Sequence, residues 1–170
     1  MLGGLGLDVL TKLLIVAHVT PGVPVRWLGG LITLRLIRNS GAAFSSGQKL
    51  TWVFATAAIV VLGYVIIRLV PRLNHPGWSV ALGLLCAGVA GNLVDRIFRS
   101  PGPLRGHVVD FIQIPFFGAI FNLADVCITV AAGLILYLSV IKNVAINGQR
   151  YARPAKAARG AAPRDAGSGR

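Results

Sequence analysis

The sequence contains no glutamate and only five aspartates, and charged residues make up 13% of its 170 positions. A soluble domain usually carries about 25% charged residues. Hydrophobic residues account for 55% of the chain, so too little polar surface is available to cover a water-soluble core. These values argue against an ordinary soluble domain and favour a membrane protein.

Cysteine and histidine are also scarce, with two and three copies. Cys86 and Cys127 lie inside apolar runs without metal-ligand spacing, so we interpret both as small buried hydrophobes. The histidines do not cluster as a metal site, and no serine has an evident base beside it. We therefore expect neither a metal nor an organic cofactor.

Basic residues outnumber acidic ones by 17 to 5, which gives a net charge of +12. Much of this excess lies in residues 142–170, behind the last hydrophobic segment, so we expect no nucleic-acid partner. The Ala, Gly, Pro and Arg content of this segment predicts a basic disordered tail. Its charge predicts a cytoplasmic location.

Three segments are long and apolar enough to cross a bilayer, which takes about 20 residues. They cover residues 50–70, 78–97 and 119–141. Residues 2–19 form a fourth candidate, interrupted by Asp8 and Lys12. Only seven residues, about 10 Å of helix, precede Asp8, so this helix is too short to reach the cytoplasm if Asp8 lies near the outer face.

Residues 20–49, between the first two expected helices, differ from a plain loop. Leu34 and Leu36 alternate with Arg35 and Ile37, a period typical of a strand, and a Gly-Gly pair at 29–30 is a turn signal. We expect a small extracytoplasmic β element on the membrane surface. Basic residues in this segment favour the opposite orientation, but the tail outweighs them. The expected fold is an all-α membrane protein with four transmembrane helices over residues 1–141 and this β element.

Each aspartate outside the tail needs an explanation, because acids are so few. Asp110 and Asp125 lie near the outer ends of expected spans, and Asp125 is about 6 Å into the last helix. A carboxylate there is costly unless it is paired or faces a wet cavity, so function is the default interpretation. The alternative is a structural carboxylate satisfied by Arg96 or by asparagines. For Asp95 we favour that alternative, because Arg96 is adjacent.

Two carboxylates held close together can act as an acid and a base. Like charges a few ångströms apart do not both ionise, so one pKa rises and the pair shares a proton. The ionised member takes a proton from water, while the protonated member polarises a peptide carbonyl. Asp110 and Asp125 are the candidate pair for such hydrolysis, which needs no covalent intermediate.

Four short blocks follow one another along the chain. They are Asn39-Ser-Gly-Ala-Ala-Phe44, Gly91-Asn92-Leu-Val-Asp95-Arg96, Val108-Val-Asp110-Phe111 and Phe121-Asn122-Leu-Ala-Asp125. Together with Asp8-Val-Leu-Thr11-Lys12, they resemble in content and order the signature blocks of the lipoprotein signal peptidase (signal peptidase II) family of bacterial membrane aspartyl proteases. The resemblance covers residues 7–141 and departs at Val9, where the family usually has glutamine.

The resemblance implies a peptidase domain over residues 1–141, in the bacterial cytoplasmic membrane, with its active site near the extracytoplasmic face. Such an enzyme removes signal peptides from prolipoproteins by cleaving before the diacylglyceryl-modified cysteine. The implied catalytic residues are Asp110 and Asp125. The residues implied to support them or to bind substrate are Asn39, Asn92, Asp95, Arg96, Asn122, Asp8 and Lys12. Asp8 and Lys12 could equally form a simple i,i+4 ion pair.

Lipidated prolipoprotein signal peptides and membrane lipids are the implied partners, and we expect a monomer. A small transporter or proton relay is the alternative function, since intramembrane aspartates also line ion paths. It predicts carboxylates spread through the depth of the bilayer, whereas here they gather near one face. A non-catalytic scaffold would explain the helices but not the clustering of Asp, Asn and Arg.

Overall fold

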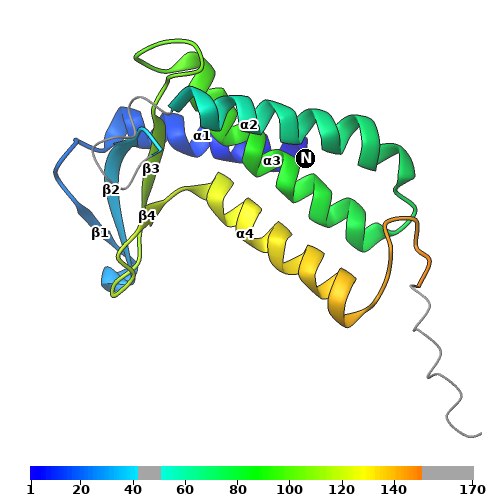
Figure 1. Cartoon of the computed structure of the whole chain (residues 1–170). Coiled ribbons are helices and arrows are strands. Elements are labelled where there is room, and N and C mark those ends of the chain that lie inside the picture. Colours follow the sequence, from blue (N-terminus) through cyan, green and yellow to red (C-terminus); the bar gives the residue numbers. More distant parts are fainter. Residues whose placement is uncertain (42–50, 151–170) are drawn as a thin grey trace, which may run out of the picture.

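The computed structural model describes residues 1–41 and 51–150. In these residues, four α-helices lie side by side, and a four-stranded antiparallel sheet covers one end of the bundle (Figure 1). The elements are α1 (Leu2–His18), β1 (Val25–Trp27), β2 (Ile32–Asn39), α2 (Thr51–Tyr64), α3 (Pro76–Phe98), β3 (Val108–Gln113), β4 (Ile120–Phe121) and α4 (Leu123–Leu136). Further helical turns continue α2 to Arg72 and α4 to Ile141.

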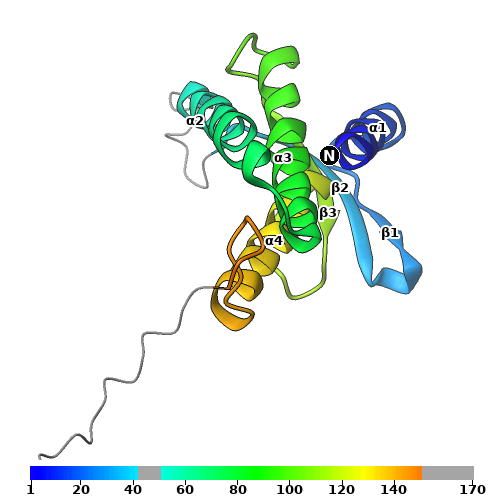
Figure 2. The same cartoon turned by 90° about the vertical axis from the view of Figure 1, so that its right-hand side faces the viewer.

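Helix α3 is the centre of the bundle, and α1, α2 and α4 each pack against it (Figure 2). Its glycines allow unusually close approach to two of these neighbours. A Cβ atom on Gly88 would lie 2.4 Å from the carbonyl oxygen of Ala124 in α4, and one on Gly91 would lie 2.4 Å from Asp8 Oδ2 in α1. Larger residues at either position would push these helices apart.

Three helices among the described residues are long and apolar enough to cross a membrane: Thr51–Arg72, Pro76–Phe98 and Leu123–Ile141. They agree with three of the predicted spans. Helix α1 forms where residues 2–19 predict a helix, but its first residues lie beside Gly83 and Ala87, midway along α3. That α1 is a fourth span remains a prediction.

The sheet has the strand order β1-β2-β3-β4, with every neighbouring pair antiparallel. Its inner face packs on the end of α1 through Leu36, Val109 and Phe111, which meet Ile15 and Val19. This contact fixes the sheet at the end of the bundle where α1 and α3 finish and α4 begins.

The sheet changes the predicted all-α fold in two respects. First, β3 and β4 come from the segment after α3, so the β element is not confined to residues 20–49, of which 42–49 lie outside the described residues. Second, α4 begins at Leu123 and not at residue 119, because Ile120 and Phe121 pair with β3 and Asn122 caps the helix.

Residues 142–150, the start of the predicted disordered tail, fold back onto the bundle. Trp78 Nε1 donates a hydrogen bond of 3.0 Å to the Val144 carbonyl, and the Asn74 N–H donates one of 3.2 Å to the Ile146 carbonyl. Val144 also forms an antiparallel bridge with Arg150. The remainder of the predicted tail lies outside the described residues.

Candidate active site

Asp110 is held on the face of β3 that points away from the apolar core. Its neighbours Val109 and Phe111 pack into that core, and side chains alternate along a strand, so Asp110 points to the opposite side. Asn39 Nδ2 donates to Asp110 Oδ2 over 2.8 Å, and Asn122 Nδ2 donates to Oδ1 over 2.6 Å. Two amides thus fix both oxygens of a carboxyl group that is only 3% exposed.

Asp125 lies in the first turn of α4, where it forms a capping box with Asn122. The Asn122 backbone N–H donates to Asp125 Oδ2 over 3.2 Å, and the Asp125 N–H donates to Asn122 Oδ1 over 3.0 Å. Asn92 Nδ2 adds a donor to Oδ1 over 2.8 Å. These donors fix the orientation of the carboxyl group at this half-buried position.

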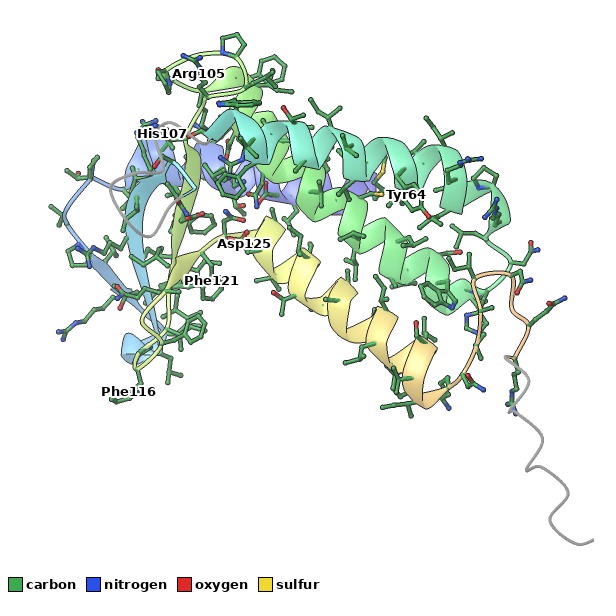
Figure 3. The ribbon with its side chains drawn as sticks, viewed as in Figure 1. Tyr64, Arg105, His107, Phe116, Phe121 and Asp125 are labelled. Carbon is green, nitrogen blue, oxygen red and sulfur yellow. The ribbon has the colours of Figure 1, made fainter. Side chains whose placement is uncertain are left out.

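Asn122 joins the two aspartates. Its fully buried side chain donates to Asp110, and its backbone and side chain both bond Asp125. The same Nδ2 also donates to Asn92 Oδ1 over 3.2 Å. Asp125 therefore lies at the sheet end of the bundle (Figure 3), bridged to Asp110 by one amide side chain.

A buried ion cluster of Lys12, Asp8 and Asp95 lies behind these residues. Lys12 Nζ is 2.8 Å from Asp8 Oδ2 and 2.9 Å from Asp95 Oδ2, and the three side chains are almost completely shielded from solvent. Asp8 Oδ1 accepts the Ala124 N–H at 2.9 Å, and Asp95 Oδ2 accepts the Val109 N–H at 3.1 Å. Each of these backbone groups belongs to the residue just before a candidate catalytic aspartate, so Lys12 ties the two backbones together.

The ion pairing of Asp95 differs from our expectation. Its partners are Lys12 and Arg99, which follows the last residue of α3, and not the adjacent Arg96. The guanidinium of Arg96 lies over the Phe54 ring, 5.5 Å from the centroid, and its buried Nη1 has no hydrogen-bond partner among the described residues. Successive residues on a helix point in different directions, which explains why Arg96 cannot serve Asp95 as Arg99 does.

All of the predicted site residues except Arg96 belong to one hydrogen-bonded network. Its members are Asn39, Asp110, Asn122, Asp125, Asn92, Lys12, Asp8 and Asp95. The expected i,i+4 pair of Asp8 and Lys12 forms, but it is part of this network and not an isolated surface pair. Arg99 and Gly91 were missed, although the Asp95–Arg99 spacing of four residues was a usable signal.

A hollow of about 320 Å³ opens beside Asp110, which gives the network an access route. Its lining comprises Ile37, Arg38, Asn39, Ser40, Asp110, Gly118 and Ile120. In the described part of the chain, no group of three or more His, Cys, Asp or Glu side chains could hold a metal ion. The lining therefore offers carboxyl, amide and guanidinium groups to a bound molecule.

Burial raises the pKa of Asp110 from its ordinary value of 3.8 to about 6. Loss of hydration is the largest cause, and the negative charge of Asp125 acts in the same direction. Hydrogen bonds from Asn39 and Asn122 and the charge of Lys12 oppose the rise without cancelling it. Asp110 thus keeps its proton to a higher pH than an ordinary carboxyl group does.

Solved structures with a similar fold are membrane enzymes. Two structures described as bacterial membrane enzymes superpose on the chain with a TM-score of 0.65 each. One is 25% identical and is matched over 89% of this chain and 91% of its own; the other is 28% identical, over 82% and 88%. The apolar helices and these matches define a multi-pass membrane enzyme.

The sequence comparisons narrow this class to one family. The family model for signal peptidase (SPase) II matches residues 1–141. Lipoprotein signal peptidases of Leifsonia xyli and Mycolicibacterium smegmatis are 45% identical over 85% of the chain and 50% identical over 79%. The matched segment covers 66% and 56% of those two relatives, so the chain spans less than two thirds of their length. The chain belongs to the signal peptidase II family.

Proposed function

We propose that this chain is an aspartyl endopeptidase that removes signal peptides from prolipoproteins, cleaving before the diacylglyceryl-modified cysteine. One observation carries the proposal: Asp110 and Asp125, from different elements, are bridged by Asn122 beside an open hollow. The names of the curated relatives supply the substrate class. The proposed setting is the extracytoplasmic face of the bacterial cytoplasmic membrane, with α1 as a fourth span and a monomer as the working unit.

The proposed reaction uses the two carboxyl groups in opposite protonation states. Asp125, acting as the carboxylate, takes a proton from a water molecule, and the water oxygen attacks the peptide carbonyl carbon. Asp110 donates its proton to the carbonyl oxygen, which gives a neutral tetrahedral intermediate. When the intermediate collapses, Asp125 passes its proton to the departing amine, the C–N bond breaks, and Asp110 recovers a proton from the hydroxyl group.

The other residues of the network are proposed to hold this pair in place. Asn39 and Asn92 orient the outer oxygens of the two carboxyl groups. The ion cluster of Lys12, Asp8 and Asp95 holds the backbones of α4 and β3 at a fixed separation. Support on rigid elements matters because catalytic groups must keep their productive geometry to within about 0.5 Å.

Arg96 is the proposed substrate-binding residue. Its buried Nη1 has no acceptor within the described residues, and a buried donor without a partner is costly. The negative charges of Asp110, Asp95 and Asp125 act on the Arg96 guanidinium, so Arg96 lies within electrostatic reach of the pair. A peptide carbonyl of the substrate would supply the missing acceptor.

The proposal is tested by incubating the purified full chain, in lipid nanodiscs, with a synthetic diacylglyceryl-modified prolipoprotein peptide. Mass spectrometry should find cleavage immediately before the modified cysteine, and the same peptide without lipid should remain intact. The competing role, a proton relay, predicts an uncleaved peptide together with proton flux through chain-containing liposomes. That pair of results would replace the peptidase assignment.

A further inference from the structure

The two hairpin turns of the sheet lie at the same end. Thr33 of β2 pairs with Gln113 of β3, which in turn pairs with Ile120 of β4, so the β1–β2 turn and the β3–β4 turn are neighbours. We call residues 27–31 and 114–118 the sheet tip. Both turns line one hollow of about 620 Å³, which is a separate hollow from the one beside Asp110.

The sheet tip exposes a group of large apolar side chains. They are Trp27, Leu28, Leu31, Ile114, Phe116 and Phe117, of which Phe117 also meets the Phe121 ring edge-on. A contiguous exposed apolar patch of this kind is uncommon on a protein surface that faces water. Such patches mark a surface that is covered by another apolar phase or molecule.

Backbone conformation at the sheet tip points to the same conclusion. Leu28 and Phe116 have positive φ angles of 48° and 66°, a region that bulky side chains rarely adopt. Both side chains are exposed, and that of Phe116 is fully exposed. Strain of this kind persists at positions where the outward direction of a side chain serves a purpose.

The orientation of the sheet brings its tip to the level of the bilayer surface. The strands run across the direction of the helices, and the sheet tip projects sideways beyond α4 (Figures 1 and 3). If the helices cross the bilayer, the sheet tip lies over the neighbouring lipid at the level of the helix ends. Aromatic side chains favour that interfacial depth.

Charge at the sheet tip matches a phospholipid surface. Arg26 lines the hollow between the turns beside the apolar side chains, and Arg35 on β2 is also exposed. Neither turn contains an acidic residue. An arginine next to exposed aromatic rings can bind a lipid phosphate while the rings enter the upper acyl region.

We propose that the sheet tip inserts into the outer leaflet of the membrane, with its apolar side chains below the phosphate level and Arg26 on a phospholipid phosphate. Strands β2 and β3 carry Asn39 and Asp110, so this insertion sets the depth of the candidate active site relative to the bilayer surface. The proposal rests on membrane crossing by the helices and does not require peptide cleavage.

The experiment measures the depth of a fluorescent label at Phe116→Cys, in a full chain carrying Cys86→Ala and Cys127→Ala, in phosphatidylglycerol-containing nanodiscs. Lipids with a quencher high on the acyl chain should reduce its fluorescence several-fold more than that of a label at Arg105→Cys. Arg105 is a matched control because it is also exposed, in the loop on the other side of the sheet end (Figure 3). Leu28→Cys, in the other turn, provides a second labelled site if one variant fails to fold.

Equal, weak quenching at Phe116, Leu28 and Arg105 would place the sheet tip in water and overturn the proposal. The other candidate occupant of the sheet tip is the substrate peptide. If a lipidated peptide added to the Asp125→Asn form removed lipid quenching at Phe116, the surface would be a peptide site and the proposal would also fail. Because these readouts need no catalysis, their failure is distinguishable from failure of the peptidase assignment.

Discussion

Helices α1 and α2 both pack on α3 but are built on opposite principles. Helix α1 buries charged side chains, Asp8 and Lys12, against α3, whereas the described buried residues of α2 are Thr51 and Ala55 and most of its other side chains face outward. Buried charge needs partners in fixed positions, while an apolar helix in lipid needs only a compatible surface. The α1 side therefore determines the geometry of the candidate active site, and α2 tolerates change.

Among the variants that compare the two helices, removal of the Lys12 cation should have the largest effect on stability and activity. Lys12→Met leaves Asp8 and Asp95 buried without their shared partner, and breaking such a buried pair costs about 3–5 kcal/mol. Thermal unfolding in detergent should show this loss, together with loss of peptidase activity. Lys142→Met is the control, because Lys142 is exposed near Tyr137 and outside the network. Similar behaviour of the two variants would contradict the role of the ion cluster.

Replacing a glycine that meets α1 and a glycine on α2 compares the two helices directly. In Gly91→Ala the new methyl group meets the Asp8 carboxylate, so Asp8 must move away from α3; overpacking of this kind costs about 1–3 kcal/mol. The measured rate of peptide cleavage should fall along with the melting temperature. Gly63→Ala on α2 meets no atom within 4 Å and should leave both unchanged or slightly improved. A harmless Gly91→Ala would show that α1 and α3 do not need this close contact.

Peptidase activity should fall when the side chain at position 96 changes shape but keeps its charge. A lysine cannot reproduce the planar fork of donors, so Arg96→Lys should lower kcat/KM by about tenfold or more, with little change in stability. Arg68→Lys, at an exposed position on the continuation of α2, should cleave normally. Near-normal turnover by Arg96→Lys would favour a generic positive-charge role.

The smallest expected effect is a shift in the pH at which cleavage activity declines. The proposed acid, Asp110, must be protonated, so activity should decline as pH rises through its pKa of about 6, with apparent values that belong to the coupled pair. Asn39→Ala removes a donor that favours the charged form, which raises the pKa and should move the alkaline decline to higher pH. Asn147→Ala, outside the network, should leave the profile in place. A shift to lower pH in Asn39→Ala would contradict the proposed protonation state.

The same pKa fixes the sign of one contribution to stability. The folded state binds the Asp110 proton more tightly than the unfolded chain does, so this contribution is present at low pH and is lost as pH rises from 3.8 through about 6.

Local patterns in the sequence predicted the structural features that depend only on residues close together in the chain. The three spans and the strand around Leu36 followed from hydropathy and alternation, and the Asp8–Lys12 pair followed from spacing. The signature blocks identified residues that the fold brings into one network. The catalytic roles of these residues stay predictions.

Contacts between distant segments could not be read from those patterns. Ile120 and Phe121 look like the start of an apolar helix, and only their pairing with β3 makes them a strand. The partner of the Asp95 carboxylate was likewise misassigned, because Lys12 and the Val109 N–H come from other elements. The partners of a buried ion pair or of a bridging asparagine are known only once the packing of the elements that supply them is known.

The most direct test of the central claim is cleavage of a lipidated prolipoprotein by Asp110→Asn, Asp125→Asn and the double variant, with stability measured beside it. A shared proton needs both carboxyl groups, so each single variant should abolish cleavage, and the double variant should be scarcely worse. Asp165→Asn, in the predicted tail, is the matched control and should cleave normally. Robust cleavage by either single variant at normal protein levels would contradict the assignment of that aspartate and the mechanism built on the pair.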